Sequence, residues 1–166
     1  MAAALLAELT NELAVEVGSF GTLELGPVPA LPEAVTIAES YGLDLSGHRA
    51  QNIAGVGLEA YDLVLGFERM HVAAAVVDGG ARLERTFTLP ELLDLFDAIP
   101  EPPTRAGAME RARARIQLAH AARPPDHRTR AVPEIADPLG KTPAAQRQTA
   151  EELRALVTDL SRRLFA

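Results

Sequence analysis

Hydrophobic residues recur every three or four positions in several stretches of the chain, the spacing that lines one face of an α-helix. The pattern is clearest over residues 5–13 and 143–165, near the two ends. Shorter stretches predict further helices over residues 32–41, 69–77, 90–98 and 104–122. Pro32 and Pro90 suit a first helical turn, where a missing N–H costs no hydrogen bond. The first helix begins without a capping residue, so we expect unsatisfied N–H groups there.

Three short segments lack helical spacing and predict β-strands. Residues 14–17 alternate apolar and polar side chains. The run Leu63–Leu65 is continuously apolar, as in a parallel strand that is covered on both faces. Residues 85–89 form the third segment. Because helices alternate with these strands, we predict one α/β domain spanning residues 1–166, with a mostly parallel sheet.

Charge and composition exclude several classes of protein. The chain has 16 Lys and Arg against 23 Asp and Glu, a net charge of -7, which argues against binding nucleic acid through its phosphates. No apolar run approaches the ~20 residues that span a bilayer, and the N-terminal residues do not resemble a signal peptide. We therefore expect a cytoplasmic protein without a membrane or nucleic-acid partner. Scattered histidines and the lack of a nucleotide-binding loop predict neither a metal nor a cofactor.

The chain contains no cysteine. This absence excludes disulfide bonds, thiolate metal sites and cysteine nucleophiles within these 166 residues.

A segment of about residues 100–135 has a different character. It opens with closely spaced prolines and is rich in arginine. One interpretation is a solvated helix and loop that carry their charge on the surface. The alternative is a surface that faces phosphate or an acidic partner.

Several segments together resemble the low-molecular-weight protein tyrosine phosphatase family, although each alone is weak. They are residues 19–22, 42–50, 61–65, 85–91 and 136–140, in that order. The resemblance covers nearly the whole chain except the arginine-rich stretch. It implies a flavodoxin-like, three-layer fold with a parallel sheet and hydrolysis of phosphotyrosine proteins or small aryl phosphates.

In that family the first strand leads into a Cys-x5-Arg phosphate loop and then a helix. By the resemblance, Met1 falls just after this loop, so the central first strand, the nucleophilic cysteine and the arginine would lie upstream of residue 1. A thiolate attacks phosphorus in these enzymes, so we expect the chain as it stands to be inactive. A sheet without its central strand exposes two edges, which a second copy or a partner protein would cover.

The resemblance also implies three site residues. Asp137, in an Asp-Pro pair, matches the general acid that protonates the leaving phenolate. Ser19 and His48 match residues that support the phosphate loop through hydrogen bonds. Taken alone, Asp137 is an ordinary turn initiator and His48 a loop histidine bonded to backbone.

Two hypotheses for the function follow. The natural protein is a phosphatase and this chain starts at an internal methionine, or the chain is a pseudophosphatase that binds or regulates a partner. Arsenate reduction, which needs several thiols, is disfavoured. The segment 22–40 has no aromatic residue to stack on a substrate ring, which makes a phosphotyrosine site less evident.

Overall fold

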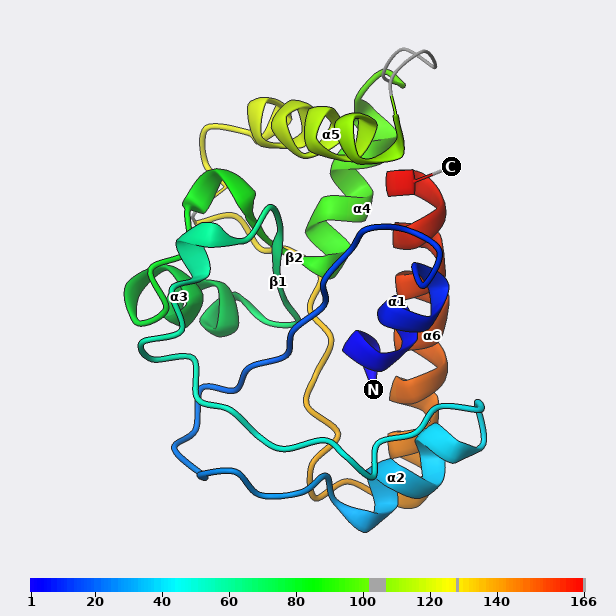
Figure 1. Ribbon diagram of the computed structural model, residues 1–166. Helices are drawn as coiled ribbons and strands as arrows, with labels where there is room; N and C mark the ends of the chain where they lie inside the picture. Colours follow the sequence, from blue (N-terminus) through cyan, green and yellow to red (C-terminus); the bar gives the residue numbers. More distant parts are fainter. Residues whose placement is uncertain (102–106, 128, 166) are drawn as a thin grey trace. The chain divides into compact units, whose positions relative to one another are not determined.

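The computed structural model, drawn in Figure 1, describes residues 1–101, 107–127 and 129–165. Its contacts divide the chain into two compact units. Unit 1 comprises Met1–Ile53 and Asp137–Ser161, and unit 2 comprises Ala54–Ala136 and Arg162–Ala166. No helix among the described residues is long and apolar enough to cross a bilayer.

Unit 1 consists of helices joined by long extended segments. Its helices are α1 (Ala2–Leu9), α2 (Pro32–Glu39) and α6 (Pro143–Phe165) as far as Ser161. Two isolated bridges join the extended segments, a parallel one between Gly21 and Asn52 and an antiparallel one between Pro29 and Arg49. The guanidinium of Arg154, on α6, lies 5.3 Å from the centre of the Tyr41 ring, just beyond α2. The apolar core of unit 1 includes Ala38, Leu43, Leu45, Ile53, Ala150, Val157 and Leu160.

The first helix of unit 1 begins as expected but ends early. Met1 precedes α1 and makes no capping hydrogen bond through its side chain, as the sequence predicts. The helix ends at Leu9 instead of residue 13, and the hydroxyl of Thr10 donates to the Leu6 carbonyl at 2.8 Å. The Leu6 carbonyl thus accepts both the N–H and the hydroxyl of Thr10, a local side-chain bond that competes with continuation of the helix.

The strand predicted over residues 14–17 is not formed, and this prediction was wrong. Val15 and Val17 are half-buried and Glu16 is exposed, so the alternation of burial persists. No strand of the described residues pairs with the segment. Alternation sets which side chains face inward, but a strand also needs a neighbour to take its backbone hydrogen bonds.

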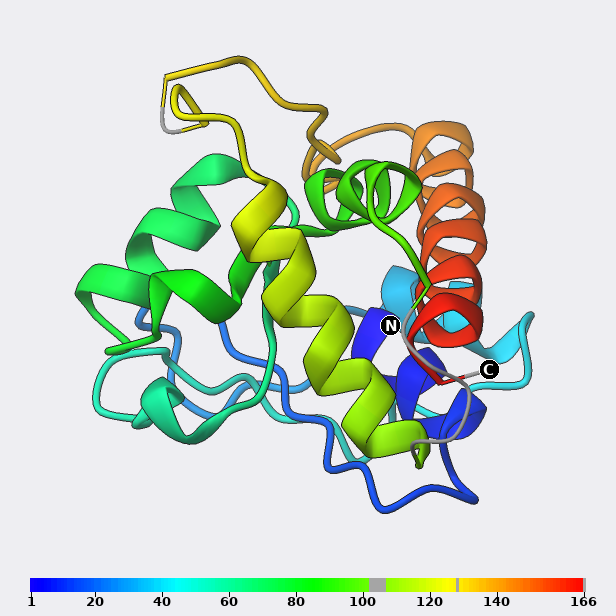
Figure 2. The same cartoon turned by 90° about the horizontal axis from the view of Figure 1, so that it is seen from above.

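Unit 2 contains the parallel sheet. Strand β1 (Val64–Gly66) pairs with β2 (Thr86–Thr88) in parallel, with Val64 opposite Thr86. Helix α3 (Arg69–Val77) packs on both strands, and α4 (Leu89–Ala98) follows β2 directly. Helix α5 (Ala108–Ala122) lies across α4 and the short helix η2 (Leu83–Arg85), as Figure 2 shows from above. A second short helix, η1, spans Leu58–Ala60. Both strands predicted here are confirmed.

The junction between β2 and α4 is buried and capped. All three residues of β2 are buried, and Phe87 is fully enclosed. Thr88 accepts a hydrogen bond from the Glu91 N–H at 3.2 Å, and Glu91 accepts one from the Thr88 N–H at 3.3 Å. This capping box satisfies two N–H groups at the start of α4. The predicted apolar side of α4 is buried: Leu92, Leu93, Leu95 and Phe96.

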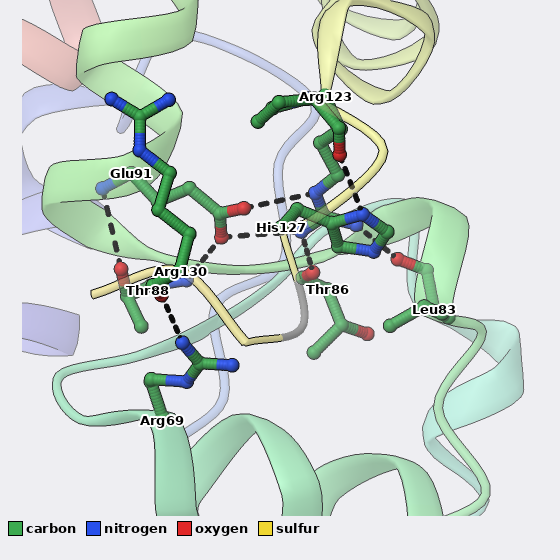
Figure 3. Close-up of polar contacts among 9 residues, drawn as sticks. Arg69, Leu83, Thr86, Thr88, Glu91, Arg123, His127 and Arg130 are labelled. Carbon is green, nitrogen blue, oxygen red and sulfur yellow. Dashed lines mark hydrogen bonds and ion pairs between the residues drawn. The ribbon is translucent and has the colours of Figure 1, made fainter. Parts of the chain in front are cut away.

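Arg123 joins the end of α5 to this junction (Figure 3). Only 3% of its side chain is exposed, and its guanidinium pairs with Glu91 at 3.0 Å. It also donates to the carbonyls of Leu83, at 2.9 Å, and Thr86. The guanidinium carbon lies 3.8 Å from the centre of the Phe87 ring. One planar cation thus bonds two carbonyls and a largely buried carboxylate at the same time.

We expect Arg123→Met to lower the free energy of unfolding by about 3–5 kcal/mol, because it leaves the Glu91 carboxylate without its cationic partner and removes two hydrogen bonds to backbone carbonyls. Urea unfolding followed by circular dichroism measures this change. Arg147→Ala, at an exposed position of α6, is the matched control and should leave the free energy unchanged. An equal effect of both substitutions would contradict a structural role for Arg123.

Gly66 ends β1 where the chain turns closely into α3. A Cβ atom at this position would lie 2.9 Å from the Cβ of His71 and 3.2 Å from the Glu68 carbonyl oxygen. The Glu68 N–H donates to Nδ1 of His71 at 3.2 Å, which holds the histidine in this place. Position 66 therefore requires a glycine, because the backbone approaches the first turn of α3 closely there.

We predict that Gly66→Ala destabilises unit 2 by about 1–3 kcal/mol, since the first turn of α3 must shift to admit the methyl group. Gly47→Ala is the control, because nothing lies within 4 Å of its Cβ position. Thermal unfolding of both variants compares them directly. If Gly66→Ala has the melting temperature of the wild type, the first turn of α3 admits the methyl group without cost and the prediction is wrong.

Candidate functional site

Asp137 lies in a short turn that leads into α6. Its carboxylate oxygen Oδ1 accepts a hydrogen bond from the Leu139 N–H at 2.8 Å, and the Lys141 N–H donates to the Pro138 carbonyl at 3.0 Å. Gly140 has a φ of +71°, a conformation that favours glycine. Asp137 and Leu139 are exposed. The local geometry is that of an aspartate-initiated turn, which leaves the carboxyl group accessible to a ligand.

The segment before Asp137 is anchored within unit 2. The Ile135 N–H donates to the Phe67 carbonyl at 2.9 Å, just beyond the carboxyl end of β1. The Arg69 N–H, at the start of α3, donates to Glu134 at 2.8 Å, and the Arg69 side chain donates to the Arg130 carbonyl (Figure 3). These bonds fix Glu134 and Ile135, shortly before Asp137 in the chain, near the carboxyl end of β1.

Ser19 and His48 lie on neighbouring segments of unit 1. The parallel bridge between Gly21 and Asn52 aligns the segment that carries Ser19 with the one that follows His48. Ser19 is exposed and His48 is half-buried. Within the described part of the chain, neither side chain makes a hydrogen bond.

Local hydrogen bonds shape the loop that carries His48. The Ser46 N–H donates to Asp44 at 2.7 Å, which holds the pKa of the Asp44 carboxyl below its usual value. Arg49 donates to the carbonyls of Ser46, at 3.0 Å, and His48, at 2.6 Å. The structure thus brings the Ser19 and His48 segments together, while Asp137 comes from the separate turn before α6.

The arginine-rich stretch is largely tied into unit 2. Arg115 is 5% exposed, pairs with Glu101 at 3.2 Å and lies 4.9 Å from the Phe96 ring centre. Arg123 is also buried, so the interpretation as a solvated surface is wrong for these two residues. Exposed Arg113 pairs with Asp62 through two hydrogen bonds of 3.0 and 3.1 Å. Residues 102–106 and 128 of this stretch lie outside the described residues.

A cavity that sequence reasoning missed lies between η2 and α5. Its volume is about 380 Å³. The wall from α5 carries Arg113, Ile116, Gln117 and His120, which the sequence analysis had not grouped. Their spacing of three, four and seven positions is the only signal in the sequence, since it places them on one helix face.

Comparison with known proteins supports the fold. No protein-family model and no curated protein matches the chain. Among solved structures, the low molecular weight protein tyrosine phosphatase from T. tengcongensis is 23% identical, with a TM-score of 0.69 over 98% of this chain and 88% of that one. YwlE arginine phosphatase from Geobacillus stearothermophilus is 21% identical, with a TM-score of 0.68 over 98% and 82% of the two chains. Vibrio vulnificus Wzb, in complex with benzylphosphonate, is 16% identical, with a TM-score of 0.67 over 98% and 88%.

These likenesses span nearly the whole chain. The parallel pairing of β1 and β2 among helices fits a flavodoxin-like sheet that lacks a strand. The chain therefore has the α/β fold of the low-molecular-weight protein tyrosine phosphatases.

Proposed function

We propose that this chain is a phosphatase-like protein that does not hydrolyse phosphate esters by itself. The observation that carries this proposal is the combination of the phosphatase fold with the absence of any cysteine among 166 residues. Cysteine-dependent hydrolysis begins when a thiolate attacks phosphorus, and no side chain of this chain supplies a thiolate. The fold alone does not replace the missing nucleophile.

Within this proposal, Asp137 keeps the role of general acid. An exposed carboxyl group on an aspartate-initiated turn fits that role. Ser19 and His48, whose side chains make no hydrogen bond in the described part of the chain, are free to support a phosphate loop. The corresponding substrates are phosphotyrosine proteins or small aryl phosphates. The alternative is a non-catalytic domain that binds or regulates a partner.

The first test is turnover by the purified 166-residue chain. We expect no release of p-nitrophenol from p-nitrophenyl phosphate above the buffer blank between about pH 5 and 8. Phosphotyrosine and phosphoarginine peptides, chosen because the similar structures include both kinds of phosphatase, should be equally inert. Turnover that survives repurification and is abolished by Asp137→Asn would contradict the proposal.

The second test supplies the missing thiolate. The strand and Cys-x5-Arg loop of the T. tengcongensis enzyme are joined ahead of Met1. We expect this chimera to hydrolyse aryl phosphates. Asp137→Asn should then lower kcat for phenyl phosphate by about 10²-fold, because a phenol of pKa near ~10 leaves poorly without a proton. The loss should be smaller for p-nitrophenyl phosphate, whose leaving group is more acidic.

The chimera separates the two functions. Cysteine-to-serine replacement in its loop is the control and should abolish turnover. A folded chimera with wild-type helicity that remains inactive favours the binding or regulatory domain. Activity that Asp137→Asn leaves unchanged for both substrates would remove Asp137 from the mechanism.

Partner and location remain proposals. A two-stranded sheet has few hydrogen bonds of its own, and we propose that a second copy or a partner protein covers its edges. Light scattering after size-exclusion chromatography tests the dimer, whose mass should be twice that of the chain. A cytoplasmic location also stays a prediction.

A further inference from the structure

The cavity in unit 2 lies at the amino ends of the two strands. Asp62 precedes β1 by two residues, and Arg82, Glu84 and Arg85 belong to the η2 segment that runs directly into β2. Ligands of open α/β sheets usually bind at the opposite edge, beyond the carboxyl ends of the strands. In this chain that edge is marked by Gly66 and Thr88. The cavity is therefore separate from the predicted phosphatase chemistry.

One wall of the cavity is a single face of α5. Arg113, Ile116, Gln117 and His120 succeed one another at helical spacing and all line the space. Ile116 is 5% exposed and supplies an apolar floor. The volume of about 380 Å³ falls within the range of small-molecule sites. The cavity is open to solvent and has room for an organic body beside an anionic group.

The charges of the cavity favour an anion. Asp62 is neutralised by Arg113, whose two hydrogen bonds hold the pKa of this carboxyl below its usual value. In all, three arginines (Arg82, Arg85 and Arg113) line the cavity with two carboxylates, those of Asp62 and Glu84. The whole chain carries a net charge of -7, so a locally positive cavity is a departure from the rest of its surface.

Several polar groups here have no partner within the protein. Nδ1 of His120 is buried and makes no hydrogen bond. In the part of the chain that the structure describes, the side chains of Arg82 and Gln117 make none either. A buried polar atom without a partner is uncommon in folded proteins and costs free energy. The side chains of Arg82 and Gln117 are exposed and line the cavity, so a ligand with acceptor oxygens can accept hydrogen bonds from both.

We propose that the cavity between η2 and α5 binds a small organic molecule that carries an oxyanion. Arg82, Arg85 and Gln117 bind the oxyanion, and Ile116 contacts the organic body. Glu84 opposes binding of the oxyanion by charge repulsion. This binding is independent of the proposed phosphatase function, because none of these residues belongs to the predicted active site.

The test is a titration of the ¹⁵N-labelled full chain with phenyl phosphate, followed by amide chemical shifts. Benzoate and inorganic phosphate are titrated separately. We expect saturable shifts over residues 82–85 and 113–120, with a Kd of about 1 mM for phenyl phosphate. Inorganic phosphate should bind at least about fivefold more weakly, since it cannot contact Ile116. Benzoate distinguishes a carboxylate ligand from a phosphate ester.

Substitutions at three exposed residues test which charges contribute to binding. Arg82→Ala should weaken binding about tenfold, as expected when a charged hydrogen bond is lost. Glu84→Gln should tighten it about two- to fivefold, because a like charge is removed. Arg147→Ala, which removes the same charge elsewhere, should leave Kd unchanged.

Each other result overturns the proposal. Shifts confined to residues 19–22, 48–52 and 137–141 would place the ligand at the predicted phosphatase site. Equal affinity for phenyl phosphate and inorganic phosphate would remove the organic body. Equal effects of Arg82→Ala and Arg147→Ala would reduce the binding to general charge, and the absence of saturable shifts up to about 10 mM would exclude the site.

Discussion

The buried guanidinium of Arg123 holds unit 2 together, because it satisfies groups from three consecutive elements at once. It pairs with Glu91 of α4, donates hydrogen bonds to the carbonyls of Leu83 and Thr86, and stacks on Phe87 of β2. A lysine has no planar fork and could not make these contacts together. The capping box of α4, the end of η2 and the parallel register of β2 all meet at this one side chain.

The contacts of Arg123 stabilise the fold of unit 2 and include none of the candidate site residues. The chain retains a turn with an accessible aspartate, Asp137, and two unengaged polar side chains on paired segments, Ser19 and His48. It does not supply the thiolate that makes such a scaffold a phosphatase. An acid protonates the leaving group while a nucleophile attacks phosphorus, so we propose that Asp137 alone produces no turnover.

The carboxyl ends and the amino ends of strands β1 and β2 differ in the side chains that surround them. At the carboxyl ends, Gly66 brings α3 close to the strand, and Phe67 holds the segment that leads to Asp137. At the amino ends, the charged face of α5 and the η2 segment enclose a cavity. Because the strands are parallel, both elements that follow a strand gather at one edge and both that precede it gather at the other.

The sequence determined the local elements, since helical spacing, proline and capping are encoded within a few residues. Helix bounds at Pro32, Arg69 and Pro143 and the strands around Leu65 and Phe87 could be predicted this way. Asp137, Ser19 and His48 came from a resemblance that only their order along the chain makes specific, and their roles stay predictions. Only the tertiary structure decided that Arg123 is buried, that residues 14–17 have no partner strand, and that one face of α5 lines a cavity. Each depends on contacts between segments far apart in sequence, and a hydrophobic pattern does not specify which partner a charged or extended segment will meet.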